Sequence, residues 1–276
     1  MKVSGTFILH CISHTGLNTH APGMYTGEVI RKIILGVAIL VMLAVSAVFA
    51  AATYNGRLEP PTLTANFVDV QQVRRITKFR SCAGHTTTPK DGRETKRSMK
   101  HYFILHPEYH QENTVKIYAP YDGQIALLFG NEEIWVAPER GFVPSVLPIN
   151  QWMFSLTHVK PAEGLKRGDK VRAGELIGYG TFSVSEPGSP SFDAVYGKMS
   201  VPPKKIDNWS SPFGGLDSVF NHMSPALLAQ YEQRGITRQN IILTKEQRDA
   251  DPCAYRDGGP YFEHKNGSND SVDLAR

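Results

Sequence analysis

The sequence has no block of like charge. Its 30 lysine and arginine residues and 26 acidic residues are spread along the chain and leave a net charge of +4. A dispersed, mildly basic composition is typical of a solvated surface. Attraction to an anionic polymer, either a cell wall or a nucleic acid, is the weaker interpretation of the charge, and we expect no nucleic-acid partner.

The composition also excludes a largely disordered chain. Hydrophobic residues make up 41% of the sequence and charged residues 20%, which is the balance of a folding chain. At 276 residues the chain is short for two large domains. We therefore expect one globular domain, together with a targeting segment and a tail.

One hydrophobic run is long enough to cross a membrane. From Ile33 to Ala52 the sequence reads IILGVAILVMLAVSAVFAAA, without a charge, which is about the length that a helix needs to span a bilayer. Arg31 and Lys32 precede the run, whereas only Arg57 follows it closely. The positive-inside rule thus predicts a single-pass protein with a cytoplasmic N-terminus and an extracytoplasmic C-terminal part.

Cleavage of this anchor is an open alternative. The run ends in small residues, 47–52, which fit a signal-peptidase site and would give a secreted protein. We favour an uncleaved anchor, because the run exceeds the usual length of a signal-peptide core. A buried helix of a soluble protein is disfavoured, since such a helix seldom lacks a polar face. Residues 1–32 form the expected cytoplasmic segment, with Met24 as a second candidate for the translation start.

Two cysteines lie in the part expected outside the membrane. An oxidising compartment favours a disulfide between Cys82 and Cys253, which would close a long loop and stabilise the fold by about 4 kcal/mol in the chain-entropy model. Two unpaired buried thiols are the alternative.

The centre of the chain has the pattern of a mainly β domain. After a Pro-containing linker at 53–66, short runs of β-branched and aromatic residues are separated by Gly, Pro, Asp and Asn up to about residue 195. Asp122-Gly123 suits a tight turn between two strands, and Gly168-Asp169 and Ala173-Gly174 divide a second, similar stretch. We expect a β domain over 67–200.

Four ordered segments carry a family resemblance. They are KIYAPYDGQI, FSLTHV, LKRGDKVRAGELIGYG and SPSFDAV. Together they resemble the lysostaphin and LytM family of zinc metallopeptidases, over roughly residues 78–197. The resemblance implies an antiparallel β-sandwich of the duplicated hybrid motif type and action on cell-wall peptidoglycan. The Gly-rich third segment also occurs in biotinyl and lipoyl carrier domains, but the lysine that a biotinyl hairpin displays is not seen here.

The resemblance implies a zinc site that this sequence keeps only in part. The family binds zinc through the His and Asp of an HxxxD motif and the second His of an HxH motif. His85 is the counterpart of the first ligand, but Pro89 stands four residues later and the nearest carboxylate is Asp91. Ser189 and Ser191 take both positions of the HxH motif. Because a serine hydroxyl is a poor zinc ligand, no cofactor is expected.

The counterpart of the family's catalytic histidine is His158, in FSLTHV. Without the metal ligands it is expected to act as a hydrogen-bonded sandwich residue or as part of a binding groove. His101, His106 and His110 are candidate replacement ligands, but their spacings do not place them on one face of a strand and Pro107 interrupts a helix.

The last third of the chain is expected to be helical over 201–264, after a Pro- and Ser-rich connection. Ser224 is an N-cap followed by Pro225, and Gly235 is the stop of that helix. Thr244 is the N-cap of a second short helix. Residues 265–276 are polar and are expected to form a mobile tail.

These observations lead to two hypotheses of different kinds. The first is a membrane-anchored, extracytoplasmic metallopeptidase-like domain without catalysis, which binds peptidoglycan or regulates an envelope protein. The second is an active zinc endopeptidase of peptidoglycan cross-bridges with an altered ligand set. An envelope adaptor without a ligand groove is a third possibility.

Overall fold

A computed structural model describes residues 27–130, 132–139, 149–181, 184–185, 189–263 and 270–275. The chain divides into two compact units, residues 1–47 and 48–276. The expected start at Met24 and most of the segment before the hydrophobic run lie outside the described residues.

Helix α1, Gly27–Arg57, contains the whole predicted hydrophobic run. It is long and apolar enough to cross a membrane by length and composition, criteria that a signal sequence also meets. Its large side chains from Val29 to Phe49 are exposed, as expected for a helix whose apolar surface is not used in a protein core. A membrane anchor and a signal sequence both have this length and composition.

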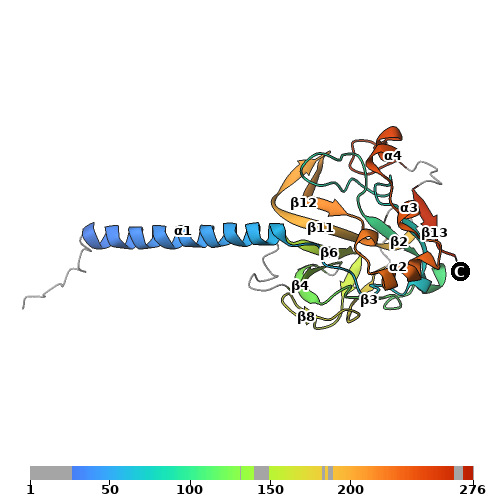
Figure 1. The fold of residues 1–276 in the computed structure, drawn as a ribbon, viewed down its shortest axis with the longest axis horizontal. Helices are drawn as coiled ribbons and strands as arrows, with labels where there is room; N and C mark the ends of the chain where they lie inside the picture. The colour runs from blue at the N-terminus through green and yellow to red at the C-terminus, as the bar shows by residue number, and fades with distance from the viewer. Residues whose placement is uncertain are drawn as a thin grey trace, which may run out of the picture. The chain divides into compact units, whose positions relative to one another are not determined.

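The second unit is mainly β, and its strand pairs are antiparallel, as the sequence predicted (Figure 1). The larger sheet has the order β13-β1-β2-β11-β6-β5-β4-β8, with β10 and β12 paired to β11, and the smaller one has the order β3-β9-β7. The strands of the larger sheet are β1 Val73–Thr77, β2 His101–Leu105, β4 Gly123–Phe129, β5 Glu133–Pro138, β6 Trp152–Thr157, β8 Lys170–Val171, β10 Val184–Ser185, β11 Ser189–Ile206, β12 Trp209–Asp217 and β13 Ser271–Asp273. Those of the smaller sheet are β3 Lys116–Tyr118, β7 Val159–Pro161 and β9 Leu176–Gly180.

The main core lies between the two sheets. Alternate residues of the larger sheet, such as Phe154 and Leu156 of β6 and Phe192 of β11, pack there with Ile117 and Ile177 of the smaller sheet. Because strand side chains alternate between faces, the residues between them lie on the opposite face of the larger sheet. That second face carries the candidate site.

Strands β11 and β12 form a long hairpin, where the sequence predicted a connection leading to helices (Figure 1). Its turn is Asp207-Asn208, and both residues have positive φ, 46° and 65°, as a type I′ turn requires. Prolines 202 and 203 fall where the register shifts, between Met199 and Lys204, so they do not remove ladder hydrogen bonds there. The β region consequently extends to Asp217 rather than ending at residue 200.

Short helices follow the hairpin. They are α2 Pro225–Glu232, α3 Arg238–Ile241 and α4 Lys245–Ala250, and single 3₁₀ turns occur at Val70–Gln72, Pro107–Tyr109 and Val219–Asn221. Both predicted N-caps are confirmed: the Ser224 side chain accepts a hydrogen bond from the Leu227 amide, and Thr244 forms a capping box with Gln247.

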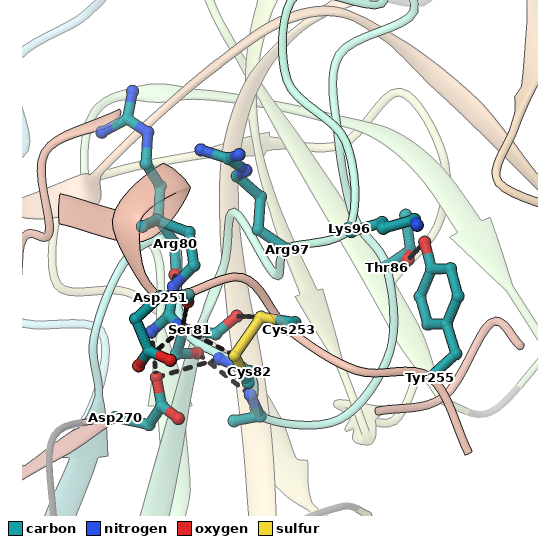
Figure 2. Close-up of a disulfide and its surroundings, with 12 residues drawn as sticks. Arg80, Ser81, Cys82, Thr86, Lys96, Arg97, Asp251, Cys253, Tyr255 and Asp270 are labelled. Carbon is teal, nitrogen blue, oxygen red and sulfur yellow. Dashed lines mark hydrogen bonds and ion pairs between the residues drawn. A yellow bond between two sulfur atoms is a disulfide. The ribbon is translucent and has the colours of Figure 1, made fainter. Parts of the chain in front are cut away.

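A disulfide joins Cys82 to Cys253, in agreement with the expected pairing (Figure 2). Arg248 of α4 lies beside it, buried, and donates hydrogen bonds to the Arg80 carbonyl, the Asp251 carbonyl and the Asp270 carboxylate. The bond and the arginine together fasten the C-terminal segment to the loop that enters the candidate site.

The expected mobile tail is in part ordered. Ser271–Asp273 pairs with β1, Arg75 makes a two-point ion pair with Asp273, and Leu274 is buried. Val272 and Leu274 give this polar segment an apolar face, which packs against the main core. The prediction of a mobile tail considered only the polar composition of the segment as a whole.

Candidate functional site

A groove of about 720 Å³ lies on the outer face of the larger sheet. Strands β5, β6 and β11 supply its base, and β12 and the loop before β2 supply further walls. Its lining combines buried polar groups with aromatic side chains: His85, Thr87, Lys100, Tyr102, Phe129, Glu133, Trp135, Ser155, Thr157, His158, Asp193, Val195, Met199, Trp209, Ser210, Ser211, Pro212, Phe213 and Tyr261. A concave site of this size, in which polar groups converge beside aromatic side chains, is typical of a ligand pocket.

The polar base of the groove is a single cross-strand row. Glu133 of β5 is paired with Thr157 of β6, Thr157 with Asp193 of β11, and Asp193 with Tyr102 of β2. Paired residues of antiparallel strands point to the same face. The ladder thus brings these four side chains together from segments that are far apart in the sequence.

Lys100 precedes β2, two residues before the last member of this row, Tyr102, and is buried between two partners. Its Nζ donates to Asp193 Oδ2 at 2.9 Å and to His85 Nε2 at 3.0 Å, and it lies 4.5 Å from the centroid of the Tyr102 ring. The side chains of Lys100 and Asp193 are only 5% and 1% exposed. The centre of the site is therefore a buried ion pair.

Burial and the neighbouring charges set the protonation states here. Burial, and then the Lys100 ammonium, lower the pKa of His85 to about 4, so its ring is neutral at pH 7. Burial alone would raise the pKa of Asp193, but Lys100 brings it below its ordinary value. Burial alone would lower the pKa of Lys100, and Asp193 raises it overall. The lysine stays charged and the aspartate ionised.

The neutral His85 ring has one possible arrangement of its proton. Nδ1 lies 2.9 Å from the Thr86 carbonyl, which accepts only from a protonated nitrogen. Nε2 then carries the lone pair, and this lone pair accepts the hydrogen bond from Lys100. The atom that would bind a metal is thus already engaged.

A backbone constraint holds His85 in place. The preceding residue, Gly84, has φ of +69°, and a Cβ there would lie 1.9 Å from the Tyr102 hydroxyl. On the open side the imidazole lies 4.8 Å from the Trp209 ring and 5.7 Å from the Tyr261 ring, centroid to centroid. Trp209 and Tyr261 are 38% and 40% exposed and form an aromatic rim.

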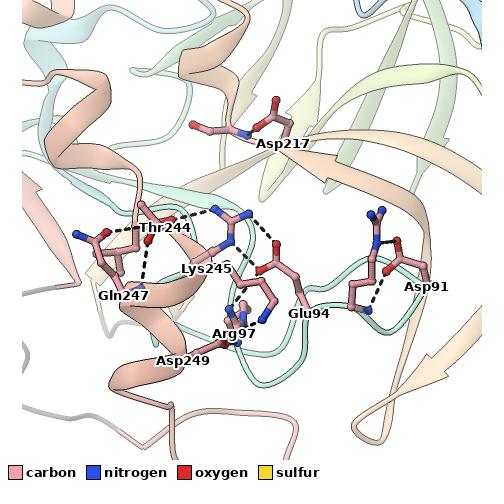
Figure 3. A network of polar contacts seen from close by, with 12 residues as sticks. Asp91, Glu94, Arg97, Asp217, Thr244, Lys245, Gln247 and Asp249 are labelled. Carbon is pink, nitrogen blue, oxygen red and sulfur yellow. Dashed lines mark hydrogen bonds and ion pairs between the residues drawn. The ribbon is translucent and has the colours of Figure 1, made fainter.

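The other predicted ligand, Asp91, is not brought to His85. Its carboxylate accepts hydrogen bonds from the Arg93 amide and side chain, at 3.0 and 2.7 Å, and it lines a separate surface depression with Pro89 and Glu94 (Figure 3). The loop between His85 and Asp91 leaves the groove, because its downstream part is fixed by Glu94, which pairs with Arg80 and Arg97.

His158 does line the groove. It follows the last residue of β6, with φ of 63°, and its Nδ1 is buried without a hydrogen-bond partner among the described residues. Of the two serines in the HxH positions, Ser191 is buried on β11, and the side chain of Ser189 lies outside the described part. The candidate replacement ligand His101 is buried elsewhere, bonded to the Thr77 carbonyl and to Ser218 Oγ.

The residues present do not fit a zinc ion. No group of three or more His, Cys, Asp or Glu side chains among the described residues is arranged to hold a metal. Zinc needs three protein ligands in a catalytic site, whereas here a lysine ammonium takes the lone pair of His85 and one oxygen of Asp193.

Sequence reasoning missed Lys100 and Glu133. Lys100 and Tyr102 share a face through their spacing of two, as do Glu133 and Trp135. This spacing predicts that the two side chains of each pair lie on the same face of the sheet. It does not predict that Lys100 contacts Asp193, which lies 93 positions later in the sequence.

No known family model and no curated protein matches this chain. Among solved structures it is similar to the M23 metalloprotease pseudoalterin from the deep sea, with a TM-score of 0.34 and 16% identity over 58% of this chain and 78% of that one. It is also similar to Helicobacter pylori Csd3, in a hexagonal crystal with a TM-score of 0.33 and 14% identity over 78% of this chain and 45% of that one. In an orthorhombic crystal of Csd3 the TM-score is 0.27, with 15% identity over 67% and 39%. The chain thus spans less than half the length of Csd3.

Proposed function

We propose that this chain is a membrane-anchored, extracytoplasmic domain of metallopeptidase-like design that binds cell-envelope peptidoglycan without cleaving it. The ordered sequence segments that resemble the lysostaphin and LytM family support the fold type and the ligand class. Arg31 and Lys32 before the hydrophobic run support the orientation.

The observation that carries the absence of catalysis is the position of Lys100. A fixed ammonium lies between an imidazole and a carboxylate, the two ligand types that zinc takes. Because like charges repel strongly in a buried site, a divalent cation at this position would have to displace the lysine. Lys100 thus already balances the charge of Asp193.

The observation that supports binding is the groove itself. It is open, and its rim offers exposed rings at Trp209, Tyr261 and Phe129. Aromatic rings supply large contact areas for a peptide or a sugar ring at low entropic cost. Regulation of an envelope partner through the same surface is the other form of this proposal.

The test combines metal content with cell-wall binding and cleavage. Full-length protein in detergent micelles is expected to contain far less than one zinc per chain, to sediment with purified sacculi and to leave them intact in a zymogram. Trp209→Ala is expected to weaken sedimentation while leaving the fold unchanged, and Trp152→Ala, outside the groove, serves as the comparison for loss of an indole. Stoichiometric zinc that disappears in His85→Ala, together with clearing of the zymogram, would overturn the proposal.

That outcome would instead favour the second candidate, a zinc endopeptidase with an altered ligand set. Its support is the convergence of His85, His158 and Asp193 on one groove. Zinc binding would then require Lys100 to move out of the site.

A further inference from the structure

The groove contains buried polar atoms, one of them a carboxylate oxygen, that have no hydrogen-bond partner among the described residues. Asp193 is 1% exposed, and its Oδ2 binds Lys100 while its Oδ1 has no hydrogen-bond partner among the described residues. His158 Nδ1 is likewise buried without a partner. Buried polar atoms are nearly always satisfied, so such atoms in an open groove point to a polar ligand, and the Asp193 carboxylate requires one that donates hydrogen bonds.

A second carboxylate stands on the same row. Glu133 accepts hydrogen bonds from Trp135 Nε1 and from the Ser155 hydroxyl, both neutral groups. In the ladder it is separated from Asp193 by Thr157 alone. A group bound over Thr157 would lie about one strand spacing, ~4.8 Å, from each carboxyl-bearing residue.

The two carboxyl groups differ in their partners. Lys100 pairs with Asp193, the His85 ring donates to the Thr86 carbonyl and accepts from Lys100, and no ion pair is formed by Glu133 in the described part of the chain. Among the described residues, Glu133 therefore has no cationic side chain paired with it. Burial raises the pKa of Glu133, and a cation bound beside the carboxyl would favour its ionised form.

The aromatic walls suit the same kind of ligand. Trp135 packs beside Glu133, and Phe129 lies 5.7 Å from the Trp135 ring. Ring faces attract cations and also pack against methylene stems. A neutral sugar would use the rings but would bring no cation to Glu133.

We propose that the groove binds a primary ammonium group carried by a peptide, held between Glu133 and Asp193 over Thr157 and flanked by Trp135. This inference deepens the proposed function, because it names the part of an envelope peptide that the groove would recognise. Lys100 then has a second role. It binds only Oδ2 of Asp193, so Oδ1 is left for the ligand, and its ammonium group occupies the position that a metal ion would need.

The test uses a capped tripeptide, acetyl-Ala-Lys-Ala-amide, whose one charge is the side-chain ammonium. Binding to the full-length protein in micelles is followed by the fluorescence of Trp135 and Trp209 and by calorimetry. Two control peptides carry Nε-acetyl-lysine or norleucine in place of the lysine. We expect the lysine peptide to bind at least tenfold more tightly than either, since hydrogen bonds to charged groups dominate the difference. Equal affinity for the three peptides, or no lysine-peptide binding at millimolar concentration, would refute the inference.

Two protein variants test whether the Glu133 carboxylate causes the preference for the lysine peptide. Glu133→Gln keeps an oxygen for Trp135 and Ser155 but removes the charge, and it should weaken lysine-peptide binding about tenfold without changing the affinity for the acetyl-lysine peptide. Glu139→Gln removes an equal charge from an exposed ion pair with Lys170 and should change neither affinity. Unaltered lysine-peptide binding by Glu133→Gln contradicts the assignment, and should that variant fail to fold, the comparison of peptides on the unmodified protein still decides.

Sedimentation with sacculi separates this inference from the proposed function. Sedimentation without lysine-peptide binding leaves peptidoglycan binding in place and removes the ammonium inference. Lysine-peptide binding without sedimentation supports the ammonium site and removes the cell wall as its source.

Discussion

Replacing Lys100 by methionine tests the buried ion pair most directly. The substitution keeps the length of the side chain but leaves the Asp193 carboxylate, 1% exposed, without its cation. Breaking a buried pair by removing one partner costs about 3–5 kcal/mol, because an uncompensated charge stays inside. At about 2–4 °C per kcal/mol for a domain of this size, the midpoint of thermal unfolding should fall by roughly 6–20 °C.

The loss should depend on pH in a defined direction. In the unmodified protein the pKa of Asp193 lies below its ordinary value, so the pair stabilises the fold above about pH 4 and loses this effect as the pH falls further. In Lys100→Met, burial without the lysine raises the pKa of Asp193 instead. Its carboxyl then takes up a proton in mild acid, and the stability difference between the two proteins should shrink between pH 7 and pH 4.

Tryptophan fluorescence is a suitable assay on the full-length protein in micelles. All three tryptophans lie in the β unit and none lies in α1, so urea unfolding reports on the β unit alone. Lys170→Met, which removes an exposed pair with Glu139, should cost no more than about 1 kcal/mol. A loss below about 1 kcal/mol for Lys100→Met at pH 7, or a loss that grows in acid, would refute the buried pair.

Three further outcomes follow from the same structure. Replacing both cysteines of the disulfide by serine should lower the free energy of unfolding by about 2–5 kcal/mol in denaturant titrations, because the bond closes a loop of 171 residues; an unchanged midpoint would show that the bond does not form. Burial lowers the pKa of His101 to about 4, so the unfolded chain binds the extra proton and stability falls from pH 6.5 to pH 4, by on the order of 3 kcal/mol; His101→Gln should flatten this slope, and an identical slope contradicts the argument. Gly84→Ala should destabilise by more than 2 kcal/mol through its clash with Tyr102, whereas Gly130→Ala, with a similar φ and open space around its Cβ, should cost about 1 kcal/mol; equal losses would remove the clash as the cause.

Local pattern was sufficient for much of the fold. The uncharged stretch from Ile33 to Ala52 predicts its helix because length and composition decide membrane-spanning capacity. The caps at Ser224 and Thr244 depend on side chains three residues or fewer from the backbone groups that they satisfy. The hairpin at 189–217 was not predicted, because its prolines and serines are typical of a loop. The prolines fit into the strand only because the pairing of β11 with β12 is interrupted beside them, and this interruption is visible only in the structure.

Some features of the candidate site also follow from the sequence, whereas others depend on the tertiary structure. From the sequence, the serines at the HxH positions, Ser189 and Ser191, and the distance of Asp91 from His85 led to the prediction of an incomplete zinc centre, and this stays a prediction. The contacts in the groove were decided only by the tertiary structure, because strand register brings Lys100 to Asp193 over 93 positions and sets Glu133 on the row of Asp193. Spacing along one strand fixes which face a side chain lies on, whereas contacts between distant strands depend on how the whole sheet is assembled.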